Sequence, residues 1–214
     1  MKPPILFLDL DNCLFDTRTV GNQFLDPIRS ELECVLSQHQ VNSMMDDMWH
    51  RALPDVLRDH GVTAELAWNV EQIYRSLELP ETAKLYVDVP AALKCMQQRG
   101  WLLHLVTKGY PELQRQKITC TDLEQFFADR IHIVCADEPK CFLSKQDAFA
   151  HIITNNNLSG QEDRIIAVGD GAEELAAGHD LHLRTVQILR PNVTRCQADH
   201  HIEHLHNLFE LLTT

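Results

Sequence analysis

ILFLDLDNCLFD, residues 5–16, is the stretch from which the fold of this chain can be predicted. Ile5–Leu8 is a short run of bulky apolar residues, which is typical of a strand buried on both faces. Asp9 and Asp11 follow it, and on extended backbone their carboxylates would share one face, about 6.6 Å apart. Two negative charges at that distance repel by about 2.5 kcal/mol at an effective dielectric of 20. An early turn at Asp11-Asn12 would explain the pair, but we interpret it as a functional site.

Apolar runs alternate with helix-like segments in the rest of the chain after residue 84. The pattern predicts strands at 101–106, 131–134, 165–168 and 185–189, helices between them, and a last helix over 202–212. Strands separated by helices favour right-handed crossovers and a parallel sheet covered on both faces. The predicted fold class is therefore α/β, with a parallel-sheet, Rossmann-like core formed by residues 1–16 and 84–214.

Residues 17–83 are surplus to that core. A strand–helix–strand unit takes about 30 residues, and the helix before Trp101 already supplies the crossover to the second strand. Apolar residues recur in the surplus segment at helical spacing. We expect a small all-helical cap at the sheet edge where α/β folds bind ligands. Its candidates for contact with a substrate are aromatic or basic: Trp49, His50, Arg51, Trp68, Tyr74 and Arg75.

Charge and composition exclude several classes of protein. The chain has 214 residues and a formal net charge of −12, which repels nucleic-acid backbones and anionic lipid surfaces. No window approaches the roughly 18 apolar residues of a membrane span. The seven cysteines form no C-x-x-C pair, which favours reduced thiols. We therefore expect a cytoplasmic protein that binds neither nucleic acid nor membranes; the sequence gives no indication of oligomeric state.

A second acidic motif follows the strand expected at 165–168. Gly169 and Asp170 come directly after this strand, and Glu174 stands about one helical turn further on. The carboxyl ends of parallel strands meet at one sheet edge, so these side chains should converge with Asp9 and Asp11. Such a cluster requires a cation. Hard oxygen ligands favour Mg²⁺, which also binds substrate phosphate.

Two further features at the same edge suggest a site for a small phosphorylated substrate. Thr107, Lys108 and Gly109 lie between a strand and a helix, where a hydroxyl and free backbone N–H groups can bind an anion; an ordinary threonine cap is the alternative. Lys145 begins a helix whose dipole it opposes, and neutralising a bound phosphate would explain its position. Lys140, in the preceding loop, is the competing lysine, and we favour Lys145.

Together these motifs resemble those of the haloacid dehalogenase-like (HAD) superfamily of phosphohydrolases. Residues 9–16, residues 105–109, the lysine at 145 or 140, and residues 169–174 occur in the family's order. The resemblance spans residues 5 to about 190, and the insertion is similar to the helical cap that subfamily I members carry after the first motif. Glu174 stands where the family usually has Asp.

The resemblance implies a phosphatase that acts on a small phosphomonoester, such as a nucleotide or sugar phosphate. Asp9 would be the nucleophile and form an aspartyl-phosphate, and Asp11 would protonate the leaving oxygen and then activate water. Thr107 and Lys145 would bind the phosphoryl oxygens, with further charge from Lys108.

The resemblance also implies the metal ligands. Asp9, Asp11 (through its backbone carbonyl) and Asp170 would hold Mg²⁺, and Glu174 would reach it directly or through water. A phosphomutase on the same scaffold, or a non-catalytic protein that binds a phosphorylated ligand, is the alternative function. The histidines near the end of the chain, including His200 and His204 four residues apart, lack a further ligand for a convincing metal site.

Overall fold

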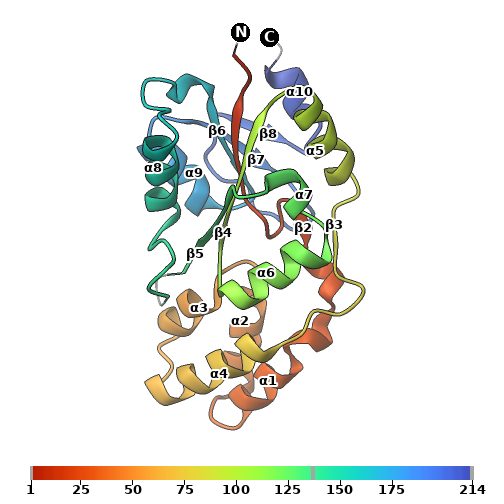
Figure 1. Cartoon of the computed structure of the whole chain (residues 1–214). Helices are drawn as coiled ribbons and strands as arrows, with labels where there is room; N and C mark the ends of the chain where they lie inside the picture. Colours follow the sequence, from red (N-terminus) through yellow and green to blue (C-terminus); the bar gives the residue numbers. More distant parts are fainter. Residues whose placement is uncertain (1, 136–137, 213–214) are drawn as a thin grey trace.

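Six parallel strands form the central sheet of the computed structural model, which describes residues 2–135 and 138–212 (Figure 1). They are β1 (Ile5–Leu8), β4 (Leu102–Lys108), β5 (Ile131–Val134), β6 (Ile165–Gly169), β7 (Arg184–Ile188) and β8 (His200–Ile202), in the order β5-β4-β1-β6-β7-β8. β1 pairs with β4 on one side and β6 on the other, and Leu8 lies opposite Leu105 and Val168. The loops that leave β1, β4 and β6 therefore emerge together at one edge.

Helices cover both faces of this sheet (Figure 1). One face carries α5 (Val89–Gln98), α7 (Glu124–Phe127) and α10 (Asn207–Leu212), and the other carries α8 (Lys145–Asn155) and α9 (Ala172–Asp180). Side chains alternate along β1, so Leu6 and Leu8 pack in the first layer and Ile5 and Phe7 in the second. Within the described ranges, no helix combines the length and apolar character needed to cross a membrane.

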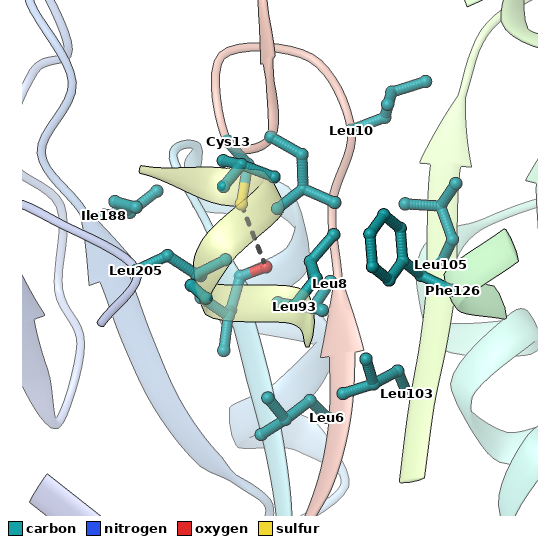
Figure 2. Close-up of a cluster of buried hydrophobic side chains, with 14 of the residues drawn as sticks. Leu6, Leu8, Leu10, Cys13, Leu93, Leu103, Leu105, Phe126, Ile188 and Leu205 are labelled. Carbon is teal, nitrogen blue, oxygen red and sulfur yellow. Dashed lines mark hydrogen bonds between the residues drawn. The ribbon is translucent and has the colours of Figure 1, made fainter. Parts of the chain in front are cut away.

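The loop after β1 is anchored in the first of these layers. Figure 2 shows Cys13 among leucines of β1, β4 and α5, with its Sγ donating to the carbonyl of Val168 at 3.9 Å. Burial raises the pKa of the Cys13 thiol well above its usual value. Since the thiolate is the reactive form of cysteine, Cys13 is a packing residue that fixes the loop carrying Asp9 and Asp11.

The cap segment 17–83 lies between the short strands β2 (Phe15–Asp16) and β3 (Lys84–Leu85), which pair antiparallel. It contains two 3-10 turns, Thr17–Val20 and Asn22–Leu25, and the helices α1 (Asp26–Glu33), α2 (Gln38–Asp47), α3 (Leu53–Asp59) and α4 (Ala64–Ser76). These helices share a hydrophobic cluster of their own, into which Tyr110 and Cys135 of the core also pack. The cap thus rests on the loops that follow β4 and β5.

The C-terminal segment corrects one sequence prediction. The helix expected over 202–212 is wrong in its first part, because residues 200–202 form β8. Ile202 is buried opposite Ile188 of β7, and α10 begins only at Asn207. His200 and His204 therefore do not lie one turn apart on a helix.

A buried histidine pair between β4 and β5 leads to a prediction on acid stability. His104 is 1% exposed, and its Nδ1 lies 3.2 Å from Nε2 of His132. Burial lowers the pKa of His104 to about 3 and that of His132 to about 4. Between pH 6.5 and these values the unfolded chain binds more protons than the folded one. We expect the protonation of His104 on unfolding, by itself, to lower the unfolding free energy by roughly 2–3 kcal/mol between pH 7 and 4.5.

Urea unfolding of the wild type and of His104→Leu at both pH values checks this expectation. The variant should lose less stability on acidification than the wild type does. An equal loss in both proteins would show that His104 is protonated in the folded state.

Candidate active site

A cavity of about 510 Å³ opens at the sheet edge from which β1, β4 and β6 emerge, and both the core and the cap line it. Most of the sequence-predicted site residues lie in its wall: Asp9, Asp11, Lys108, Gly109, Lys145, Asp170 and Glu174. Thr107, the penultimate residue of β4, is buried and is not among the residues that line the cavity, and Lys140 lies outside it, exposed to solvent. The strand ends thus bring the predicted motifs together.

Asp9 and Lys145 form the buried centre of this site. Asp9 follows β1, is 7% exposed, and donates its backbone N–H to the carbonyl of Val168 at 3.0 Å. Lys145 is the first residue of α8, and Ser144 caps that helix with its side chain. The Lys145 Nζ lies 2.9 Å from Oδ1 of Asp9 and 2.9 Å from Oε2 of Glu174. Of the two candidate lysines, it is Lys145 that contacts the predicted nucleophile.

Asp9, Asp170 and Glu174 form what we call the acidic cluster, in which one carboxylate oxygen of each lies within 4.8 Å of the others. Burial, together with the neighbouring carboxylates, raises the pKa of Asp9 to about 7 and that of Asp170 to about 8. With Lys145, the fully ionised cluster carries two uncompensated negative charges. A divalent cation with a preference for oxygen ligands would neutralise them, so the residues fit Mg²⁺.

Glu174 owes its place in the acidic cluster to two glycines before α9. A Cβ at position 169 would lie 2.1 Å from the Glu174 Oε1, so only glycine leaves room for this side chain. The N–H of Gly171 donates to the same oxygen at 2.6 Å. The side chain therefore folds back over the start of its own helix and points toward Asp9.

The carboxylate of Asp11 lies outside the acidic cluster, contrary to its predicted convergence with the other three acids. The Lys117 Nζ lies 2.7 and 2.9 Å from its two oxygens, and the Gln114 Nε2 donates to Oδ2 at 3.0 Å. Both donors belong to α6 (Pro111–Cys120), the helix that follows Gly109. These bonds separate the Asp11 side chain from the acidic cluster.

The motif at Thr107–Gly109 is only partly available to an anion. Thr107 is fully buried, and its hydroxyl has no hydrogen-bond partner among the residues that the structure describes. An unsatisfied buried hydroxyl indicates a missing partner, such as a phosphoryl oxygen. The predicted backbone role of Gly109 is wrong in this structure, because its N–H donates to the carbonyl of Val134 at 3.0 Å.

Lys108 is also engaged, by carboxylates. Its Nζ lies 2.7 Å from Asp55 of α3 and 3.0 Å from Glu173 at the start of α9. It thereby joins the cap to the core across the cavity, and a bound phosphate would have to compete with these two partners.

Of the six cap residues predicted to contact a substrate, four line the cavity and two do not. Trp49, His50, Arg51 and Tyr74 line the cavity. Trp68 instead is 62% exposed on the outside of the cap. Arg75 stacks 4.0 Å from the ring centre of Tyr110 and bonds Glu138 at 2.7 Å, so it holds the cap against the core.

Sequence reasoning missed Gln114, Lys117 and Asp55. The first two had a signal: with Ile118 they occupy the i, i+3, i+4 stripe of a helix whose apolar face is buried, and polar residues on such a stripe need partners. No local pattern distinguishes Asp55 from the other acidic residues of the cap.

Comparisons with known proteins agree with this geometry. The family model of haloacid dehalogenase-like hydrolases matches residues 4–182. A search of curated proteins finds no significant match.

Among solved structures, the chain is similar to YfnB of Bacillus subtilis, described as a HAD-hydrolase bound to magnesium (18% identity, all of both chains, TM-score 0.70). It is also similar to a HAD phosphatase of Thermococcus onnurineus (19%, 99% of this chain and 98% of the other, TM-score 0.66). A third similar structure, from Thermotoga maritima, is described as a beta-phosphoglucomutase (11%, 99% and 100%, TM-score 0.60). At these identities the likeness establishes the fold.

Proposed function

The chain belongs to the haloacid dehalogenase-like hydrolase family, and from this premise we propose that it is a Mg²⁺-dependent phosphatase of small phosphomonoesters. The observation that carries the proposal is the arrangement around Asp9. A buried carboxylate lies against a buried ammonium at 2.9 Å, beside two further carboxylates, at the base of a cavity. In this arrangement Asp9 would be the nucleophile, Lys145 the cation that binds the phosphoryl group, and Asp170 and Glu174 further ligands for a metal ion.

In the first half-reaction an Asp9 oxygen attacks phosphorus, and the bond from phosphorus to the leaving oxygen breaks. Asp11 gives its proton to that oxygen, so the products are an alcohol, a phosphorylated Asp9 and an ionised Asp11. Lys145 and the hydroxyl of Thr107 donate to the phosphoryl oxygens and stabilise the charge that is spread over them.

In the second half-reaction water attacks the phosphorylated Asp9. Asp11 now takes a proton from the water as its oxygen bonds to phosphorus, and the bond between phosphorus and the Asp9 oxygen breaks. Inorganic phosphate leaves, and both aspartates return to their initial state.

The acidic cluster, with the backbone carbonyl of Asp11, would hold the metal ion. Mg²⁺ bound there supplies positive charge that offsets the repulsion between carboxylates and phosphate. Glu174 is one methylene longer than Asp, and its contacts with Lys145 and Gly171 already direct it to the cluster.

Phosphate release over a panel of nucleotides and sugar phosphates, in Mg²⁺ or in EDTA, tests this proposal. We expect at least one ester to be hydrolysed in Mg²⁺, with a loss of about 100-fold or more in EDTA that excess Mg²⁺ reverses. Full turnover in EDTA would contradict the metal requirement. If protein that circular dichroism shows to be folded releases no phosphate from any ester, the proposed phosphatase function is contradicted.

A phosphomutase is the alternative function, and the structural similarity to the Thermotoga protein is the observation that favours it. It would share the first half-reaction and use a substrate hydroxyl in place of water in the second. Phosphorus NMR of the same reaction mixtures distinguishes the two, because a mutase moves the phosphoryl group between positions without releasing phosphate. Saturable binding of an ester without any reaction would indicate a binding protein instead.

A further inference from the structure

Two side chains of α6 fix the carboxylate of Asp11. Lys117 bonds both oxygens at 2.7 and 2.9 Å, and Gln114 bonds Oδ2 at 3.0 Å. Both donors are nearly fully buried, whereas the Asp11 side chain keeps 27% of its surface accessible. The donors thus hold the carboxylate from its buried side, and its remaining surface faces the cavity.

The donors are themselves fixed. The Gln114 Nε2 also donates to the carbonyl of Lys108 at 2.7 Å, and the Lys117 Nζ lies 5.7 Å from the ring centre of Phe15. Gly109 makes this arrangement possible: its φ is +146°, and a Cβ there would lie 2.6 Å from the Gln114 Nε2. Any other residue at 109 would displace the amide that bonds Asp11.

This arrangement suits a group that must give and then take a proton. General acid catalysis requires the proton donor within hydrogen-bond reach of the leaving oxygen, and a freely rotating carboxylate meets that condition only part of the time. In addition, Asp11 is two residues from Asp9, and these bonds keep its side chain from joining the acidic cluster as a further ligand.

We infer that Lys117, assisted by Gln114, is a positioning residue that aims Asp11 at the leaving-group oxygen. The inference rests on the proposed phosphatase and assigns a second function to the helix that follows the Thr107 motif. Gly109 contributes to this positioning because it leaves space for the side chain of Gln114. This role replaces the contact with phosphate that the sequence predicted for Gly109.

Two esters of similar shape provide the test: p-nitrophenyl phosphate, whose leaving group departs without a proton, and p-nitrobenzyl phosphate, whose leaving group needs one. In Lys117→Met we expect kcat/KM for the benzyl ester to fall about 100-fold and that for the phenyl ester by less than about 3-fold. Lys117→Arg keeps the cation and should recover most of the benzyl activity. Gln114→Met should also lower the ratio of kcat/KM for the benzyl ester to that for the phenyl ester, by a smaller factor.

Two further variants calibrate the experiment. Asp11→Asn removes the acid and should show the largest difference between the two esters in the loss of kcat/KM. Lys94→Met, at an exposed lysine of α5, should leave both rates unchanged.

Equal losses for the two esters in Lys117→Met, or no loss for either, would overturn the inference. Suppose that Asp11→Asn loses more kcat/KM for the benzyl ester than for the phenyl ester, while the folded Lys117 and Gln114 variants do not. The inference about positioning then fails, and the proposed phosphatase function is still supported. If the wild type hydrolyses neither these esters nor any of the panel, both fail.

Discussion

Replacing Asp9 by Asn should abolish hydrolysis of every ester that the wild type accepts, with a loss of roughly 10⁴-fold or more in kcat. The amide has almost the shape of the carboxylate, so the packing around β1 is preserved. It cannot, however, form the phosphorylated intermediate. Burial and neighbouring carboxylates raise the pKa of Asp9 to about 7, so burial there favours a neutral side chain over a charged one. The loss should therefore appear in turnover and not in folding.

Steady-state phosphate release and thermal melting, measured on the same preparations, check this expectation. Asp163→Asn is the matched control, because Asp163 is an exposed acid in the 3-10 turn Glu162–Arg164, at the opposite end of β6 from Asp170. The control should turn over at the wild-type rate. Retained turnover in Asp9→Asn would show that another group is the nucleophile.

The sheet edge was predictable because short-range patterns determine it. Ile5–Leu8 and the run at 165–168 are buried apolar segments that end in carboxylates, and parallel strands align their carboxyl ends. From that geometry Asp9 and Asp170 are expected to lie near one another, whereas Glu174 reaches them through the space left by Gly169 and the N–H of Gly171. Lys145 followed from its unfavourable position at the start of a helix, which needed an explanation outside the helix.

The contacts that the sequence did not reveal are long-range and involve flexible side chains. Lys117 and Asp11 are 106 residues apart, and a lysine on a helix can extend to solvent or to a buried carboxylate with little change in local pattern. The pair formed by Lys108 and Asp55 depends in the same way on how the cap sits over the core. β8 was mistaken for helix because three residues at a sheet edge are too few to show an alternating pattern.

The second large effect is expected at Lys145. Burial alone would lower the pKa of its ammonium, but the carboxylates of Asp9 and Glu174 raise it well above its usual value, so the group stays charged. In Lys145→Met that charge is lost beside the reacting phosphoryl group, and kcat/KM should fall by about 10³-fold, as when one preorganised donor to a transition state is removed.

Lys140→Met is the matched control for this prediction, since Lys140 was the competing lysine and its side chain is exposed outside the cavity. Its activity should stay within about 2-fold of the wild type, because an exposed charge away from the reacting atoms is largely screened. Thermal melting in Mg²⁺ distinguishes a catalytic loss from unfolding, because Asp9 and Glu174 lose a partner in Lys145→Met but would keep the proposed metal ion. Lys145 donates to both Asp9 and Glu174 at 2.9 Å, and removing one partner of a buried ion pair is destabilising. We therefore expect a variant that melts at a lower temperature than the wild type, is folded at the assay temperature, and has little activity. An equal loss in Lys140→Met would instead assign the phosphoryl contact to the loop before α8.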